Sequence, residues 1–339
     1  MKKATRITSV SLLALFISLF STGQIQVPRN LQTNKTQQEI KQRQIEKATL
    51  REPSLYVYDE YVNEGGFPMY FLEDFTGKGS NIVHRKRGVQ GIGADNKGNV
   101  YEVVYVGPSE KPYIKEVRKF GSFTGPLEFP TAVACDKQGR IYITDRALNQ
   151  VIRIDNLDGD NLVRFGETGS GIGQFNTPSG IAIDNNGRIY VADMGNRRIV
   201  RIDDMAGEGW VTYNGQQYGT QGLQVELVKD IAVDSKNRLY YLRNNIVIRV
   251  DDMRGSNIKF FGGLNSSLGH LLVAPSGISI DYKDRIYISD MDSRSLTRIN
   301  DIDGSGRVLL FKGSDGKDLF RRPSHIVVYF PVIEKINIR

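Results

Sequence analysis

One sequence pattern recurs along this chain about every forty to fifty residues, and it limits the possible folds more than any other feature. The fullest copy reads PSGIAIDNNGRIYVADMGNRRIVR at 178–201. Good copies stand at 130–153 and 275–298, and weaker ones at 89–105 and 228–249. A period of this length, filled with short strands, is typical of a propeller or a similar repeat array. Such a fold says little about chemistry, so function must be inferred from the residues that decorate it.

Each copy divides into four short strands. In the fullest copy, GIAID is an apolar first strand, RIYVAD a second, RIVRID a third and WVTYNG a fourth. Tight turns separate the strands, so neighbouring strands are expected to run antiparallel. Four antiparallel strands per repeat predict the blade of a β-propeller.

Two details of the repeat support this interpretation. The residue before the arginine of the first hairpin should need a left-handed backbone, and Gly, Asn and Asp tolerate that conformation best. The five copies hold Gly98, Gly139, Gly187, Asn237 and Asp284 there.

Arginines begin the second strands, and acidic or amide residues end the third strands. We therefore expect cross-strand pairs at one corner of most blades. The pairs join Arg140 to Asp155, Arg188 to Asp203, Arg238 to Asp251 and Arg285 to Asn300.

The repeats supply five full blades and two leftover pieces. The tail at 323–339 is expected to give two inner strands, and the segment at 54–77 two more. Together they predict a sixth blade built from both termini, which closes the ring and removes its open edges. The predicted fold is therefore all-β, a six-bladed β-propeller of four-stranded antiparallel blades over 53–339.

The first 23 residues have the pattern of a secretory signal peptide. Lys2, Lys3 and Arg6 precede an apolar run at 7–20, and small residues follow at 21–23. The run is short for a membrane span, and an uncleaved N-terminal anchor is the alternative. A secreted or periplasmic location is predicted. The stretch at 24–52 is rich in Gln, Lys, Thr and Asn, and predicts a polar linker or a solvated helix.

Charge and cysteine content add mild constraints. The formal net charge is +7, and removal of the three basic residues of the signal leaves +4. That charge suits an anionic envelope surface or an acidic polymer without requiring one. Cys135 replaces an apolar strand residue of the other copies and is expected in the core. A single cysteine excludes an internal disulfide.

These repeats resemble the NHL family of six-bladed propellers, whose pattern is P-x-G-I-A-x-D-x-x-G-x-I-Y-V-A-D-x-x-N-x-R-I. The match is near complete at 178–199 and, with the terminal fragments, covers about 53–339. RIDDMAGEGW at 201–210 resembles bacterial exported members. The resemblance implies the fold, but NHL propellers include interaction modules, RNA-binding domains and a few enzymes.

One NHL enzyme type, the peptidyl-amidoglycolate lyase, holds zinc through the histidines of P-H-G motifs. In this chain the corresponding histidine positions are Ser179, Ser276 and Ser324. His325 stands one residue later, where a strand residue points the other way. The chain thus departs from the lyase pattern at the metal ligands. P-loop, nucleophile-elbow and Ser–His–Asp patterns are also absent from the sequence.

Two metal-site alternatives remain open. His84, His270 and His325 belong to blades that are neighbours around the ring, so a three-histidine zinc site with an open position is conceivable. It would make the protein an exported metal-dependent lyase or lactonase-like enzyme. The segments DNLDGDN at 155–161 and DIDGSG at 301–306 resemble calcium loops, although turn chemistry also explains Asp and Gly there.

The leading hypothesis is a non-catalytic binding or scaffold propeller of the bacterial cell envelope, without a cofactor. Loops between second and third strands, together with those leading into first strands, should share one basic face, where binding is the default for a propeller. The predicted ligand-binding residues on this face are Arg146, Arg197, Arg198, Arg243, Arg294, Arg85, Lys86, Arg87, Ser179 and Ser276. The expected partner is an anionic glycan, a peptide or a protein; export argues against nucleic acid. A purely structural, self-associating assembly protein is the third possibility.

Overall fold

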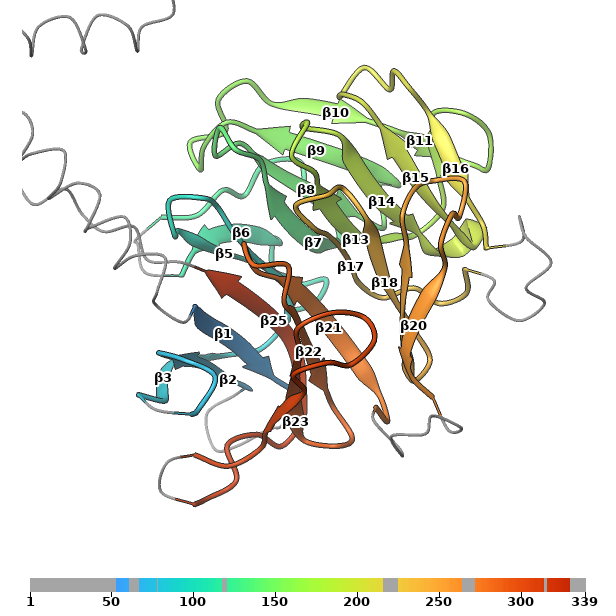
Figure 1. Ribbon diagram of the computed structural model, residues 1–339. Coiled ribbons are helices and arrows are strands. Elements are labelled where there is room, and N and C mark those ends of the chain that lie inside the picture. Colours follow the sequence, from blue (N-terminus) through green and yellow to red (C-terminus); the bar gives the residue numbers. More distant parts are fainter. Residues whose placement is uncertain are drawn as a thin grey trace, which may run out of the picture. The chain divides into compact units, whose positions relative to one another are not determined.

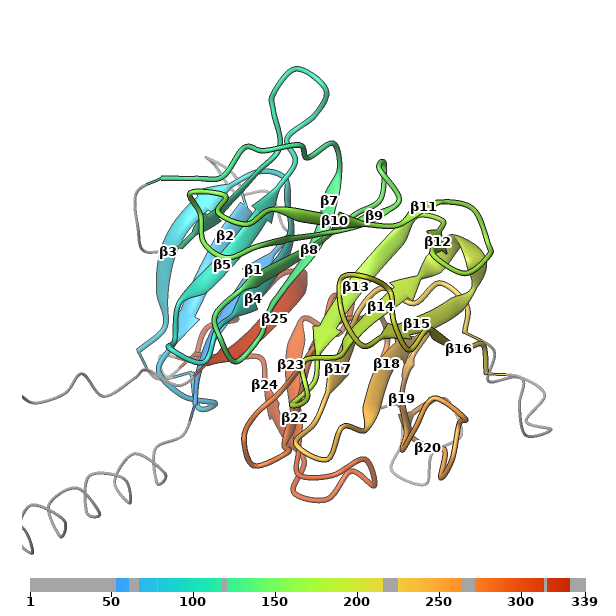
Figure 2. The same cartoon turned by 90° about the horizontal axis from the view of Figure 1, so that it is seen from above.

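The structure is a computed structural model in which residues 53–60, 67–77, 79–117, 121–215, 225–263, 272–313 and 316–329 are described. These residues form antiparallel sheets arranged around a common centre (Figures 1 and 2), with one short 3₁₀ turn, η1 (Met194–Asn196). The predicted signal peptide, the linker at 24–52 and His270 lie outside the described residues. In the part of the chain that is described, no helix is long and apolar enough to cross a membrane.

The described strands build six blades, numbered here from the first repeat. Blades one to three consist of β4 (Val89–Ala94), β5 (Val100–Val104) and β6 (Tyr113–Glu116); β7 (Pro130–Cys135), β8 (Ile141–Asp145), β9 (Gln150–Ile154) and β10 (Val163–Phe165); and β13 (Pro178–Ile183), β14 (Ile189–Asp193), β15 (Arg198–Ile202) and β16 (Val211–Tyr213). Blades four and five consist of β17 (Ile231–Val233), β18 (Leu239–Arg243), β19 (Ile246–Val250) and β20 (Lys259–Gly262); and β21 (Pro275–Ile280), β22 (Ile286–Asp290), β23 (Ser295–Ile299) and β24 (Val308–Leu310).

Two departures from this regular plan lie early in the chain. In blade one, the fourth strand is reduced to a single bridge between Ile114 and Phe123. A two-stranded parallel sheet, β11 (Glu167–Thr168) with β12 (Gln174–Phe175), lies in the loop that leads into blade three.

The sixth blade joins the two ends of the propeller, as predicted. Its strands are β25 (Pro323–Tyr329), β1 (Ser54–Asp59), β2 (Phe67–Leu72) and β3 (Asn81–Lys86), in that order across the sheet. β1 lies antiparallel to β25, with Tyr56 opposite Val327 (Figure 1). Each of the six inner strands contacts the next, and β25 contacts both β21 and β4, so the ring is closed.

The division of the sixth blade differs from the expectation. The tail contributes one described strand instead of two, and the N-terminal segment contributes three instead of two. Residues 84–86, part of the stretch at 84–88 that was expected to lead into blade one as a loop, belong to the outer strand β3. Residues 330–339 lie outside the described part of the chain.

The first hairpin of each repeat has the predicted backbone. All five tested positions have positive φ, for example +82° at Gly187 and +61° at Asn237. Left-handed conformation is cheap for glycine and tolerable for asparagine and aspartate. The alignment of the repeats is therefore confirmed.

The prediction named the wrong acidic partner for these arginines. Arg188 Nε lies 2.6 Å from Oδ2 of Asp184, at the end of the first strand, and Asp203 pairs instead with Arg201 at 3.6 Å. Asp184 also accepts hydrogen bonds from the backbone N–H groups of Asn186 and Arg188, and from the hydroxyl of Tyr190. Asp184 and Arg188 lie four residues apart on the two sides of one tight turn, so the turn itself places them in contact. Blades two, four and five repeat the arrangement.

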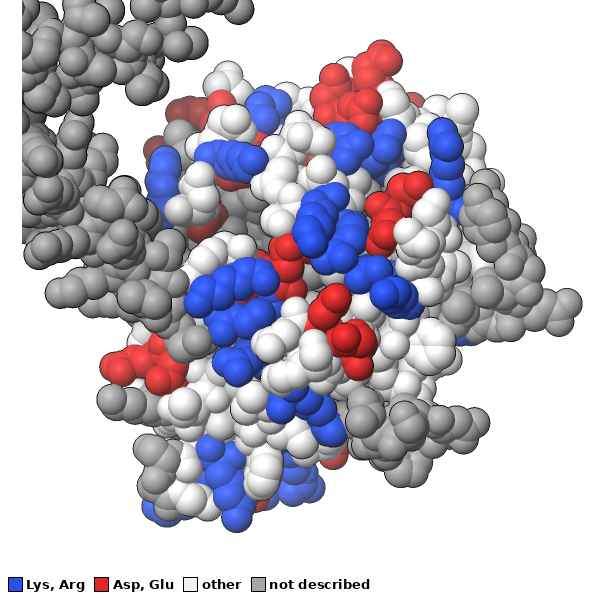
Figure 3. Space-filling view, viewed as in Figure 1, with Lys and Arg blue, Asp and Glu red and all other residues white. Residues whose placement is uncertain are grey.

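The core lies between blades, where the faces of successive sheets pack together. The cluster between blades three and four, for example, contains Ala192, Tyr213, Tyr241 and Ile248, all at most 1% exposed. Cys135 is partly buried against the cluster of blades one and two, and burial raises the pKa of its thiol. On the face seen in Figure 3, basic and acidic side chains alternate in small groups, without one continuous basic surface.

Candidate functional site

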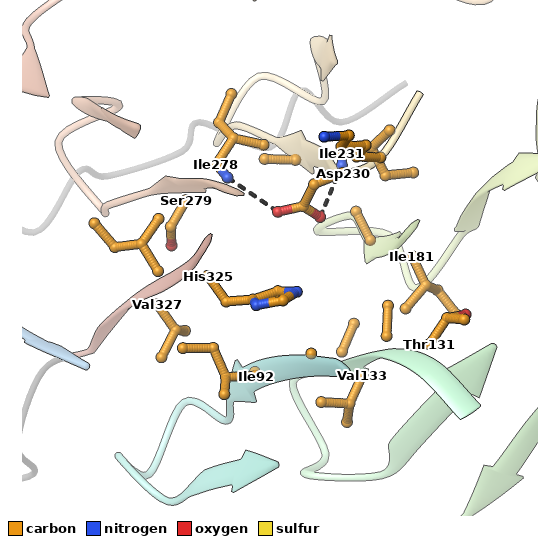
Figure 4. Close-up of a pocket in the computed structure, with 18 of the residues that line it drawn as sticks. Ile92, Thr131, Val133, Ile181, Asp230, Ile231, Ile278, Ser279, His325 and Val327 are labelled. Atoms are coloured by element: carbon orange, nitrogen blue, oxygen red, sulfur yellow. Dashed lines mark hydrogen bonds between the residues drawn. The ribbon is translucent and has the colours of Figure 1, made fainter. Parts of the chain in front are cut away.

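A cavity of about 580 Å³ lies at the centre of the ring, where the inner strands meet (Figure 4). Its size suits a small ligand or an inserted side chain. Positions are counted along each repeat copy from its first residue, which is Val89, Pro130, Pro178, Val228, Pro275 or Pro323. The fourth position gives the wall an apolar band, formed by Ile92, Val133, Ile181, Ile231, Ile278 and Ile326. Among the described residues that line the cavity, none is Phe, Tyr or Trp.

The residues at the second position of the repeat copies surround the mouth of the channel. The Thr131 hydroxyl donates to the Pro178 carbonyl at 3.0 Å, Ser179 to that of Val228 at 2.7 Å, and Ser276 to that of Pro323 at 3.1 Å. Each bond joins one blade to the next. Ser179 and Ser276, predicted as ligand-binding residues, thus use their hydroxyl protons within the ring. Blade four departs from this pattern, because Lys229 occupies the same position and is exposed.

The residue at the third position of each repeat copy alternates in size around the ring. Blades one, three and five have Gly91, Gly180 and Gly277, whereas blades two, four and six have Ala132, Asp230 and His325. A Cβ atom at Gly180 would lie 3.1 Å from the Asp230 Cα, and one at Gly277 would lie 3.0 Å from the His325 Cα. Glycine at these positions lets the next blade approach closely, and the alternation places an acid and an imidazole in the channel wall.

Asp230 is held by two backbone amides. Its Oδ1 accepts a hydrogen bond from the N–H of Ile231 at 2.9 Å, and its Oδ2 accepts one from Ile278 of the next blade, also at 2.9 Å. Burial raises the pKa of Asp230 to about 6, although both amides favour the charged form. Sequence analysis did not select this residue. The available signal was its replacement of the repeat's usual glycine.

His325, a predicted metal ligand, projects into the channel from β25 (Figure 4). Its Nδ1 lies 2.9 Å from the Ser324 hydroxyl, and the ring also bonds to the Gln90 backbone. Burial lowers the pKa of the imidazole and Lys229 adds to this effect, whereas Glu60 and the Gln90 bond oppose it. The neutral ring is therefore favoured at neutral pH.

Charged and flexible side chains complete the mouth. Glu60, Arg146 and Lys229 come from blades six, two and four, and Met194 and Met291 lie in the loops of blades three and five. The Arg146 guanidinium lies 4.9 Å from the ring centre of Phe129, which holds this predicted ligand residue in place. Both signs of charge therefore meet at the mouth.

The other predicted arginines of the loop face fall into two groups. Arg197 and Arg294 are exposed, with φ of 53° and 55°, at turns where blades two and four have Asn149 and Asn244. Arg243 is half-buried at the end of β18.

Arg198 is half-buried and anchors a loop. It bonds to Asp193 at 2.8 Å, to the Ser170 carbonyl at 2.6 Å and to the Gln174 carbonyl at 2.7 Å. Its guanidinium also lies 5.4 Å from the ring centre of Trp210. These contacts hold it within the fold.

Arg85 and Lys86 form the end of β3, where Lys86 lies opposite Phe67, and Arg87 follows in the short link to β4. Arg85 and Arg87 are exposed, whereas Lys86 donates to Glu102 at 3.2 Å and to the Tyr113 hydroxyl at 2.9 Å. Two of the three residues therefore belong to a strand and not to the expected loop.

Glu102 is fully buried in β5 and contacts three basic residues. His84 Nε2 lies 2.9 Å from its carboxylate, Lys86 Nζ 3.2 Å and Lys115 Nζ 3.3 Å. Burial favours the neutral acid, but the hydrogen bond to His84 and the nearby charges outweigh burial and lower the pKa of Glu102. The cluster thus joins the outer strand of blade six to blade one.

The structure does not bring His84 and His325 together. Across blade six, His325 lies opposite Tyr58, Tyr58 opposite Met69, and Met69 opposite His84. Three strand spacings separate the two histidines by roughly 14 Å, too far for one zinc ion with bonds of about 2 Å. In the described ranges, no three His, Cys, Asp or Glu side chains are grouped to share a metal ion.

The two calcium-like segments form turns between third and fourth strands. Asn156 Oδ1 accepts from the Asp158 N–H at 3.0 Å, and Asp303 Oδ1 accepts from the Ser305 N–H at 2.8 Å. The equivalent turn at Asp252 has the same type of bond, to the N–H of Arg254. Asp and Asn side chains commonly accept such hydrogen bonds from the backbone N–H two residues later in a turn.

The sequence comparisons agree with this geometry. Residues 164–319 match the family profile described as "Teneurin NHL domain". The matched segment is therefore an NHL domain, and the ring of which it is part is a six-bladed propeller. No curated protein matches this NHL propeller by sequence.

Several solved structures share the propeller fold. A chain of a nidogen/laminin complex is 17% identical, with a TM-score of 0.60 over 82% of this chain and 98% of that one. A protein of unknown function from Bacteroides caccae is 12% identical, with a TM-score of 0.54 over 82% and 99%. Virginiamycin B lyase from Staphylococcus aureus is 19% identical, with a TM-score of 0.49 over 72% and 75%. At these identities the likeness concerns the fold alone.

Proposed function

We propose that this NHL propeller is an exported, non-catalytic binding protein of the cell envelope. It holds an acidic, partly apolar segment of a protein partner across its loop face, at the mouth of the central channel. The observation that carries the proposal is the set of cations on that face, Arg146, Arg197, Lys229 and Arg294. The closed ring fixes the loops that present them, and rigidly presented loops are the usual binding elements of such scaffolds.

Exposed apolar residues on the same face favour a protein partner. Ile172, Leu227 and Val273 are 81%, 69% and 55% exposed, and all three precede inner strands. The start of an inner strand lies beside the end of the second strand, as Pro178 lies opposite Asp193, so these residues share a face with the arginines. Apolar contacts within a basic rim suit a protein segment.

A glycan is a weaker fit for the channel. Sugar rings bind well when their C–H faces lie on Phe, Tyr or Trp side chains, and the described channel lining has none of these. The nidogen/laminin complex is an assembly of proteins, and its propeller-like chain makes a protein partner a reasonable choice here as well. The proposal therefore commits to a protein and leaves an anionic glycan as an outcome of the test.

The test neutralises four cations with substitutions that the repeats themselves supply. Arg197→Asn and Arg294→Asn install the residue that blades two and four hold at the same left-handed turn, and Lys229→Ser installs that of blades three and five. Arg146→Gln completes the variant. The matched control replaces four exposed lysines of the first hairpins, at the opposite end of the blades, with glutamine. These are Lys97, Lys137, Lys236 and Lys283.

Binding is measured by fluorescence anisotropy with short peptides of glutamate and leucine, and with polygalacturonate as the anionic glycan. We expect the peptides to bind more tightly than the glycan, and the loop-face variant to lose roughly tenfold or more in affinity. The control variant, with the same change in net charge, should bind normally. Equal losses in both variants, or tighter binding of polygalacturonate, would contradict the proposal.

A further inference from the structure

The carboxylate of Asp230 faces the channel without a cationic partner. Its hydrogen bonds come from two backbone N–H groups, and no Lys, Arg or His among the described residues forms an ion pair with it. It is half-buried and lines the cavity. A carboxylate removed from bulk water without a countercharge is costly, and a bound cation would relieve that cost. This position is glycine in blades one, three and five.

His325, whose imidazole projects into the channel, does not supply that countercharge (Figure 4). Its ring already bonds to the Ser324 hydroxyl and to the Gln90 backbone, and its neutral form is favoured. A cationic ligand in the channel would supply the countercharge that Asp230 lacks.

The surrounding wall restricts the shape of such a ligand. Ile181, Ile231 and Ile278 line the cavity near the carboxylate, so a chain of methylene groups would lie against apolar surface. Lys229 and Arg146 stand at the mouth and would repel a second cation but attract an anion. The channel thus combines a deep anion, an apolar wall and a cationic opening.

We propose that the central channel binds an alkylammonium group, with Asp230 as its counter-ion. A ligand with an anionic group at its other end fits best, because that group meets Lys229 and Arg146 at the mouth. Two sources have this chemistry: a free ω-amino acid, and a lysine side chain inserted by a protein segment whose neighbouring residues are acidic. The site shares Lys229 and Arg146 with the loop face, but its counter-ion, Asp230, is not one of the loop-face cations, so a change at Asp230 tests this proposal by itself.

The first experiment is calorimetric titration with 6-aminohexanoate, hexanoate and 1,6-diaminohexane. We expect 6-aminohexanoate to bind most tightly, and hexanoate and 1,6-diaminohexane each to bind with roughly tenfold or more lower affinity. Asp230→Asn removes the charge but retains an oxygen for the Ile278 N–H, and should weaken 6-aminohexanoate by roughly tenfold or more. Asp230→Gly, the residue of the odd blades, should do the same. Asp303→Asn removes an exposed carboxylate elsewhere and is the control.

A second titration distinguishes the two sources. It uses an acidic peptide with one lysine and the same peptide with norleucine in its place. If 6-aminohexanoate binds, the channel accepts a free ligand. If only the lysine peptide binds, and Asp230→Asn abolishes its advantage over the norleucine peptide, the source is a partner's side chain.

The proposal is overturned if hexanoate binds as tightly as 6-aminohexanoate, if Asp230→Asn leaves the affinity for 6-aminohexanoate and for the lysine peptide unchanged, or if none of the ammonium probes binds the intact protein. The four loop-face cations remain present in Asp230→Asn, so failure here leaves the loop-face proposal untouched.

Discussion

At the third position of each repeat copy, one side chain controls how closely two blades approach. The glycines of blades one, three and five leave no room for a Cβ atom against the next strand. The adjoining blades can therefore hold Ala132, Asp230 and His325 close to the axis. Close packing leaves few alternatives, because buried atoms in contact cannot shift far. The chemistry of the channel thus depends on a spacing that three glycines provide.

Asp230 should make the stability of the protein depend on pH in an unusual direction. Its pKa in the folded state is about 6, above the ordinary value of 3.8, so the folded protein holds the proton more firmly than the unfolded chain. This group therefore stabilises the fold as pH falls from about 7 to about 4, and destabilises it at higher pH. In Asp230→Asn that contribution is absent.

Urea unfolding near pH 5 and near pH 8 can measure this difference. Asp230→Asn should gain stability relative to the wild type at the higher pH, and the gain should shrink at the lower pH. Between pH 5 and pH 8 this stability difference should change by about 1.4 kcal/mol, because the contribution varies only from pH 5 up to the folded pKa of about 6, by about 1.4 kcal/mol per pH unit. Groups such as Lys229 and His325 are present in both proteins. The same free-energy gap at both pH values would show that burial does not shift this carboxyl.

Single residues were also the hardest to assign from the sequence. His325 is one of only three histidines in the sequence and stands out, whereas a single aspartate such as Asp230 belongs to no motif with a recognised chemistry. Arg198 was assigned to a ligand, yet its bonds run to Asp193 and to carbonyls 24 to 28 residues earlier. Such partners are distant in the sequence, so local patterns do not reveal them.

Among the strands, β25 is the one that closes the ring. It pairs with β1 and contacts the inner strands of blades five and one. Deletion of residues 325–339 removes most of this strand and leaves the edge of β1 unpaired, so we expect the whole propeller to lose stability. Thermal unfolding followed by circular dichroism should show a lower, broader transition. A truncated protein that unfolds at the wild-type temperature, with equal cooperativity, would exclude closure by β25 as a source of stability.

The elements were predictable where the information is local. Hairpins follow from glycine, asparagine or aspartate at fixed positions, and the structure has positive φ at each of them. The strand β3 was taken for a loop because a run of basic residues usually faces water. Lys86 instead contacts Glu102, which is buried 16 residues later in the next blade. An ion pair between blades depends on how the blades stack, which the repeat pattern does not encode.

For the whole molecule, the closed ring makes each blade depend on its neighbours. The fold could be predicted because the same pattern of strands and turns recurs in every repeat, so several copies support one assignment. The candidate site could not be predicted in this way, because it depends on residues that differ between repeats and on how those residues are arranged around the ring. His84 and His325 belong to one blade and still lie on opposite edges of its sheet.

The hydroxyl ring at the channel mouth offers a test at this scale. Thr131, Ser179 and Ser276 each donate to a carbonyl of the next blade, so we interpret them as links between blades. Thr131→Val with Ser179→Ala and Ser276→Ala removes three such bonds. Each loss leaves a carbonyl without its partner and should cost about 1 kcal/mol. Chemical denaturation should therefore show a loss of about 3 kcal/mol, with binding of 6-aminohexanoate unchanged. Full stability with weakened binding would instead return Ser179 and Ser276 to the role of ligand-binding residues.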